Sequence, residues 1–143
     1  MSLVLAAFLF VVATGAAGIM TADSNYFANH QFTIKKMGAK WFVVDKDNKK
    51  EPIRANKADD ITWTADGSDL EFTFPAEIGK YLQKVDGNYD GSKYTAKVED
   101  GKKLKLKVKD GVIDGRYEYE VLVLADSSQA EGSSPPVIII GGS

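Results

Sequence analysis

Hydrophobic residues fill the start of the chain without interruption and alternate with polar residues through the rest. No residue from Met1 to Ala22 is charged. The most apolar positions of this segment are Leu3, Val4, Leu5, Phe8, Leu9, Phe10, Val11 and Val12. A helix rises about 1.5 Å per residue, so residues 2–20 in helical form match the ~30 Å hydrocarbon core of a bilayer. The pattern predicts a single transmembrane helix over residues 1–22.

A cleaved secretory signal peptide is the alternative interpretation of this segment. Small residues that suit a signal peptidase occur at Ala13, Gly15, Ala16 and Ala17. A signal peptide usually carries Lys or Arg ahead of its apolar run, and neither residue occurs there. We therefore expect a retained, single-pass anchor, with the remaining chain on the periplasmic or extracellular side.

The chain after Asp23 shows short alternating segments separated by turn residues. Leu70, Phe72 and Phe74, for example, alternate with Glu71 and Thr73, which is the period of a strand with one buried face. Strands are expected over residues 32–34, 41–44, 61–64, 70–74, 94–98, 104–109, 117–124 and 137–140, with a short strand at Ile53. The only expected helix covers residues 76–85, where Gly79 weakens it.

This pattern divides the chain into an anchor, a linker and one domain. Residues 23–31 are expected to form a juxtamembrane linker, in which Tyr26, Phe27 and His30 lie at the membrane interface. Residues 32–143 are expected to form a mainly β sandwich. The aromatic residues of its strands are expected in the core and at its rim: Trp41, Trp63, Phe72, Phe74, Tyr117 and Tyr119.

Composition excludes several classes of function. The net charge is −2, from 18 basic and 20 acidic residues, so no strong field favours nucleic acid as a partner. The chain has no cysteine, which removes disulfides, thiolate metal ligands and cysteine nucleophiles. With one histidine, His30, it also lacks the usual general base for a nucleophile. We expect no catalytic residue and no small-molecule substrate.

Three segments resemble the cupredoxin family. Residues 57–64, Lys-Ala-Asp-Asp-Ile-Thr-Trp-Thr, are similar to the cupredoxin strand that an acidic turn precedes and that carries a buried Trp. Residues 115–121, Gly-Arg-Tyr-Glu-Tyr-Glu-Val, resemble its glycine-x-tyrosine-x-tyrosine-x-cysteine segment, and residues 137–140 resemble its closing strand. The resemblance implies a cupredoxin-like Greek-key β-sandwich behind the N-terminal transmembrane helix.

The same resemblance implies that the copper site of cupredoxins is missing. A blue copper site uses two His, one Cys and a weak axial ligand. Val121 stands at the Cys position, the first His position falls near Asp69 and Leu70, and residues 126–132 contain neither His nor Met. We expect no metal and no cofactor. The pair Asp59 and Asp60 is interpreted as turn chemistry and solvation rather than a metal site.

A row of lysines is the most unusual surface feature that the sequence predicts. Lys103, Lys105, Lys107 and Lys109 alternate with apolar residues, so one strand presents its positive charges on one face. One interpretation is an edge strand that lysines protect from aggregation. The other is a docking stripe for an acidic partner or for anionic lipid headgroups.

Three functions from different classes are compatible with these observations. The favoured hypothesis is a non-catalytic, membrane-anchored accessory subunit whose exported domain docks onto a larger membrane complex, respiratory or photosynthetic. Its partners are then membrane lipid and the proteins of that complex. The second is an exported module that binds a small ligand or metal. The third is a fibre or surface protein that assembles by strand addition, with residues 136–140 as the donor strand.

Overall fold

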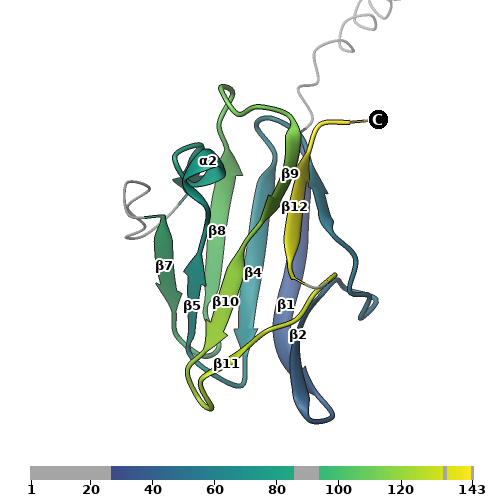
Figure 1. Ribbon diagram of the computed structural model, residues 1–143, viewed down its shortest axis with the longest axis vertical. Helices are drawn as coiled ribbons and strands as arrows, with labels where there is room; N and C mark the ends of the chain where they lie inside the picture. Colours follow the sequence, from purple (N-terminus) through teal and green to yellow (C-terminus); the bar gives the residue numbers. More distant parts are fainter. Residues whose placement is uncertain (1–26, 86–93, 134, 143) are drawn as a thin grey trace, which may run out of the picture.

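The computed structural model describes residues 27–85, 94–133 and 135–142 of the chain. These residues form β-strands and one short helix, so the expectation of a mainly β domain is confirmed. The strands run along the long axis of the molecule (Figure 1). The predicted transmembrane helix, residues 1–22, lies outside the described residues. Within the ranges given above, no helix is long and apolar enough to cross a membrane.

A five-stranded sheet forms one layer, which lies at the back in Figure 1. Its strands, in spatial order, are β2 (Lys40–Val44), β1 (Asn29–Met37), β4 (Asp60–Asp66), β8 (Lys103–Val108) and β6 (Leu82–Lys84). Strands β1 and β4 are parallel, and the other neighbours are antiparallel. Strand β8 therefore lies inside the sheet, between β4 and β6.

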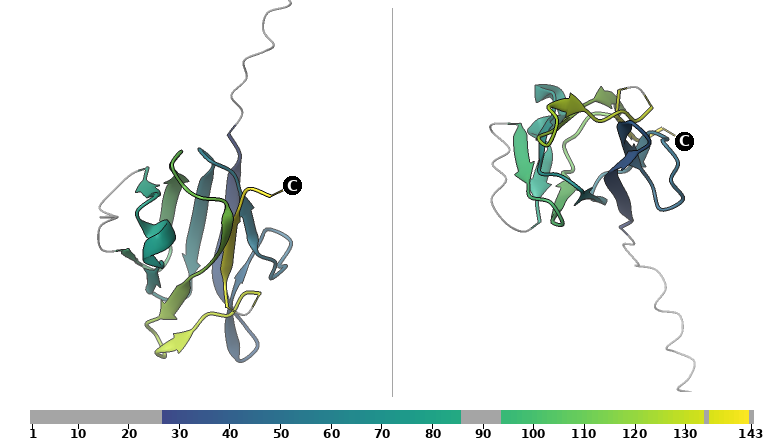
Figure 2. Two further views of the ribbon diagram at one scale, coloured as in Figure 1. Left: turned by 45° about the horizontal axis from the view of Figure 1, so that its top comes forward. Right: turned by 90° about the horizontal axis from the view of Figure 1, so that it is seen from below.

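Two shorter sheets form the facing layer (Figures 1 and 2). One contains β11 (Ser128–Gln129), β10 (Glu120–Val123), β5 (Leu70–Thr73) and β7 (Thr95–Val98), and the other contains β3 (Ile53–Ala55), β12 (Val137–Ile140) and β9 (Gly115–Glu118). The sequence predicted one strand over residues 117–124, but the structure divides it at Tyr119. The chain leaves β9 in one sheet and enters β10 in the other, so a single straight strand cannot form.

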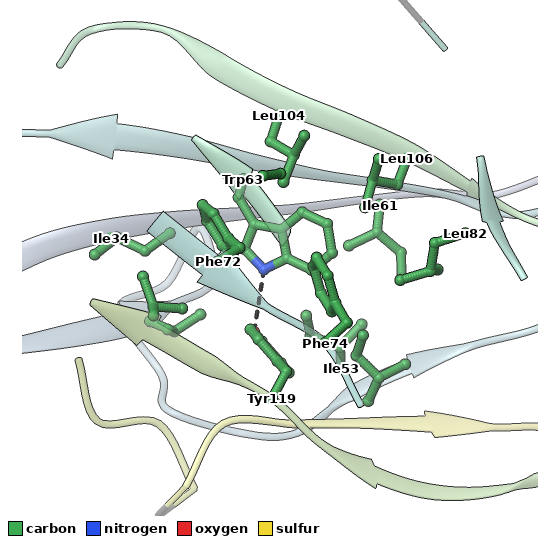
Figure 3. Close-up of a cluster of buried hydrophobic side chains, with 14 of the residues drawn as sticks. Ile34, Ile53, Ile61, Trp63, Phe72, Phe74, Leu82, Leu104, Leu106 and Tyr119 are labelled. Carbon is green, nitrogen blue, oxygen red and sulfur yellow. Dashed lines mark hydrogen bonds between the residues drawn. The ribbon is translucent and has the colours of Figure 1, made fainter. Parts of the chain in front are cut away.

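The core lies between the layers and is centred on Trp63. Its ring lies 5.4 Å from Phe72, 5.7 Å from Phe74 and 5.8 Å from Tyr119, measured between ring centroids (Figure 3). All four side chains are buried. The indole Nε1 of Trp63 donates a hydrogen bond of 3.0 Å to the Tyr119 hydroxyl. Trp41 is also buried and Tyr117 is partly buried, as the alternation predicted.

The predicted helix over residues 76–85 is much shorter in the structure. Helix α2 covers only Ala76–Gly79, and Leu82–Lys84 form β6 instead. Leu82 is buried and pairs with Val108 of β8. Burial of this residue against β8 outweighs the weak helix propensity around Gly79, because tertiary packing routinely overrides local propensity.

Two other boundaries differ from the prediction. The linker expected over residues 23–31 overlaps β1, which begins at Asn29 because residues 29–35 pair with residues 60–66 of β4. The hydrophobic segment at the C-terminal end is not a free donor strand. Strand β12 pairs with β3 on one side and β9 on the other, and Val137, Ile138 and Ile140 are buried. This packing removes the basis of the strand-donation hypothesis.

Candidate functional site

The residues that stand where cupredoxins carry copper ligands lie in the core of this domain or in the loops at one end of it. Val121 is fully buried and lies opposite Phe72 in the ladder of β10 and β5. Leu70 is fully buried opposite Val123. Neither side chain has a lone pair to donate, and copper sites need imidazole and thiolate ligands. The residues present therefore do not fit a copper ion.

The loops at the end of the sandwich that carries Asp69 and Asp126 are held by hydrogen bonds. Trp41 Nε1 donates to Asp126 Oδ2 at 2.9 Å, and Asp126 Oδ1 accepts hydrogen bonds from Ser128. The hydrogen bonds from Ser128 and then from Trp41 hold the pKa of Asp126 below its usual value. Asp69 Oδ1 accepts from the Asp100 amide at 2.8 Å. The described residues contain no group of three His, Cys, Asp or Glu side chains that could hold a metal ion.

The only histidine binds Asp59 at the opposite end of the molecule. His30 Nε2 lies 2.8 Å from Asp59 Oδ2, and the amides of Asn56 and Ala28 donate to the same carboxylate at 2.9 and 3.0 Å. Burial acts to raise the pKa of Asp59, but the hydrogen bonds from His30 and from the two amides outweigh it and lower the pKa. This carboxylate therefore joins the start of β1 to the turn before β4.

This pair was not predicted from the sequence, which placed His30 at the membrane interface and indicated turn chemistry and solvation for Asp59. The turn role of Asp59 is confirmed by its bond to the Asn56 amide, but the side chain is buried rather than solvated. His30 and Asp59 are 29 residues apart, and no local pattern links them.

Two of the four lysines in the row form ion pairs, and the other two form none with the described residues. Lys105 and Lys107 both lie beside Asp60, with Nζ to carboxylate distances of 3.5 and 3.3 Å. Lys103 and Lys109 are exposed and form no ion pair with the described residues. The edge-strand interpretation is wrong, because β8 pairs with β4 and β6. The predicted docking role of the four lysines remains a hypothesis.

A cleft of about 670 Å³ lies between α2 and β9. Aromatic side chains and carboxylates both line it, and its walls come from the two segments where β5 ends and where β9 passes into β10. The lining residues are Thr73, Phe74, Pro75, Glu77, Arg116, Tyr117, Glu118, Tyr119, Glu120 and Pro135. No sequence pattern predicts this cleft, because it depends on the divergence of β9 from β5.

One side of this cleft is an unpaired strand edge. Strand β9 pairs with β12 only, and no other described strand pairs with it. The Tyr119 amide donates to the Pro136 carbonyl at 3.0 Å, so alternate residues of β9 direct their backbone groups toward β12. The amides and carbonyls of Arg116 and Glu118 consequently point away from β12.

Solved structures are similar to this chain at low sequence identity. A multi-copper oxidase from Pediococcus acidilactici matches 82% of this chain and 27% of its own, with a TM-score of 0.53 and 14% identity. A multicopper oxidase from Aquifex aeolicus matches 84% and 30%, with a TM-score of 0.49 and 8% identity. An amicyanin variant matches 82% and 85%, with a TM-score of 0.41 and 9% identity.

The chain spans only 27% of the length of the Pediococcus oxidase that it matches. No protein-family model matches the sequence, and no curated protein matches it significantly. The similarity therefore concerns the fold alone. The described residues form a mainly β domain with cupredoxin-like neighbours.

Proposed function

We propose that this chain is a non-catalytic, membrane-anchored accessory subunit whose cupredoxin-like domain docks onto a larger membrane complex, respiratory or photosynthetic. The observation that supports this proposal most is the burial of Val121 at the position of the copper-binding cysteine. Packing around Trp63 holds the domain together. In cupredoxins the position of Val121 carries the copper-binding cysteine, whereas here Val121 is part of the packed core. A fold without that chemistry is suited to binding and positioning.

The position of Phe27 supports an anchored arrangement. Residues 23–26 separate the apolar segment from Phe27, and four residues reach at most about 14 Å. An anchor over residues 1–22 would therefore hold the Phe27 end of the domain close to the bilayer surface. Ile113 lies in the loop between β8 and β9 at the same end (Figure 1). The side chains of Phe27 and Ile113 are 53% and 70% exposed.

This orientation also limits the role of the lysine row. Strand β8 runs from Lys103, at the far end, toward Lys109, at the Phe27 end. Six residues of strand span about 20 Å. Charges are screened over about 8 Å at physiological salt, so Lys103 would lie beyond the field of the lipid headgroups. In this arrangement the distal part of the row serves an acidic protein surface and only its Lys109 end meets lipid.

The proposal is tested by isolating the full chain from membranes of its native source in mild detergent and identifying what accompanies it. We expect the proteins of one membrane complex, a chain that resists carbonate extraction, and no stoichiometric copper after a chelator wash. A variant without residues 1–22 should fold but lose the complex, because tethering supplies a high local concentration. Recovery of the chain alone, or bound copper in elemental analysis, would contradict the proposal.

A further inference from the structure

We propose that the cleft between α2 and β9 binds an extended basic segment of a partner protein, which adds to the free edge of β9. This inference deepens the proposed function, because it assigns the docking to a surface and a type of ligand. It is independent of the lysine row, which lies on the outer face of the other layer.

The backbone of β9 provides the first reason. Arg116 and Glu118 present an amide and a carbonyl each on the side away from β12, and these groups can form an antiparallel or parallel ladder with an added strand. The edge is short, because β9 covers only Gly115–Glu118. A segment of three or four residues is enough to pair with it.

The shape of the cleft indicates a single strand rather than a second folded domain. The cleft lies between β9 and the segment of Phe74, Pro75 and Glu77 that follows β5. A single extended segment needs only the width of one strand, about 4.8 Å, whereas a second copy would bring its own β12 beside its β9. The volume of about 670 Å³ falls within the range of ordinary peptide and ligand pockets.

The side chains of the cleft select the chemistry of the segment. Of the three aromatic rings that line the cleft, Phe74 and Tyr119 are buried in the core and Tyr117 is partly buried, so the exposed part of Tyr117 offers an apolar surface to a side chain of an added strand. Glu77, Glu118 and Glu120 are exposed, against one cation, Arg116. None of these four forms an ion pair with the described residues. Lysine or arginine at the intervening positions would complement the excess of negative charge.

The test uses the peptide fluoresceinyl-Gly-Val-Lys-Val-Arg-Val-amide, labelled at its amino terminus so that both cations are kept, and the full chain in detergent micelles. Fluorescence anisotropy should show saturable binding, and the amide resonances of Arg116 and Glu118 should shift in NMR spectra. A peptide with glutamate in place of its two cations should bind at least about tenfold more weakly, as should one methylated at alternate backbone nitrogens.

Two variants test whether the peptide binds at the edge of β9, and the methylated peptide separates strand addition from charge attraction. Glu118→Pro removes an outward amide and a carboxylate while keeping the ladder to β12, since proline is tolerated on the solvent side of an edge strand. We expect it to lose binding by about tenfold or more. Glu99→Lys reverses a charge at an exposed residue outside the cleft and should leave binding unchanged.

The inference fails if the methylated and unmethylated peptides bind equally, or if Glu118→Pro binds as well as the parent chain when circular dichroism shows it folded. Self-association of the chain through β9, detected by analytical ultracentrifugation and lost in Glu118→Pro, would replace it with a dimer. Failure of the proposed function is seen separately, as a chain that binds the peptide but brings no complex from membranes.

Discussion

At the scale of single residues, the domain depends on polar groups placed inside the core. The indole Nε1 of Trp63 comes from the five-stranded sheet, and the hydroxyl of Tyr119 comes from the junction of the two shorter sheets. Their hydrogen bond joins the layers at the centre of the core (Figure 3). Burial, only partly offset by this bond, raises the pKa of Tyr119 far above its usual value, so the hydroxyl stays neutral.

Tyr119→Phe should destabilise the domain by about 1–3 kcal/mol, because it leaves the buried indole N–H without its acceptor. Trp63→Ala should cost about 3–5 kcal/mol, through the cavity that it creates. Both are measured by chemical denaturation, with Tyr81→Phe, at a partly buried ring, as the matched control. A stability for Tyr119→Phe equal to that of Tyr81→Phe would show that the Trp63 bond contributes nothing.

Asp59 gives the stability of the domain a dependence on acid. Its folded-state pKa lies below the ordinary value of 3.8. A lowered pKa contributes stability that is present above the unfolded pKa and is lost as the pH falls through it toward the folded pKa. The parent chain should therefore lose stability below about pH 5, and Asp59→Asn should be less stable at neutral pH with a flatter acid profile. Parallel acid profiles for the two proteins would contradict this role.

At the scale of elements, the position of β8 decides what its lysines do. The alternation of Lys and apolar residues is the same for an edge strand and for an interior strand with one solvated face. Pairing with β6 makes β8 interior, and pairing with β4 brings Asp60 between Lys105 and Lys107. The Oδ1 atom of Asp60 is buried and accepts no hydrogen bond within the described residues, so the ion pair with Lys107 is the contact that compensates its charge.

Asp60→Asn should destabilise the domain by about 1 kcal/mol, since it leaves two neighbouring lysines without their counter-ion. The difference from the parent chain should shrink at high salt, because salt screens charges at the surface. Thermal melts at low and high salt measure both effects. Lys103→Ala, at an exposed lysine, is the control and should change stability by less than about 0.5 kcal/mol. An effect of Asp60→Asn that does not depend on salt would contradict an electrostatic cause.

At the scale of the whole molecule, the two ends of the sandwich differ. One end carries Phe27, Ile113 and the His30–Asp59 pair, and it is the end from which the described chain starts (Figure 2). The other end carries the loop after β10, where Leu124 is 44% exposed. The anchor that we propose would place the first end against the bilayer and the second end away from it.

Single cysteines can test this orientation directly, because the chain has no cysteine of its own. The variants Ile113→Cys and Leu124→Cys are labelled with an environment-sensitive fluorophore and reconstituted as full chains into phosphatidylcholine vesicles. The emission maximum of the label at position 113 should shift to shorter wavelength, and its fluorescence should be quenched by lipids with spin-labelled headgroups. The label at 124 should show neither effect, since about 30 Å of strand separates the two ends. Equal responses at both positions would contradict the proposed orientation.

The sequence by itself determined the mainly β class, most of the strands and the aromatic core of this domain. Alternation with a period of two identified the strand around Phe72, and the buried aromatic residues followed from the same period. The absence of cysteine and the single histidine excluded a blue copper centre, because the chain lacks the side chains that such a centre requires. These properties depend on local periodicity or on residue chemistry, and both can be derived from the order of residues alone.

The tertiary structure alone decided which segments are neighbours. Strand pairing placed β8 inside a sheet, brought Asp60 to two lysines, and joined His30 to Asp59 across 29 positions. The divergence of β9 from β5 opened the cleft beside Arg116 and Glu118. None of these contacts has a local signal, because pairing between distant strands is selected by packing of the whole core, and an alternating strand has the same sequence pattern at an edge and in an interior.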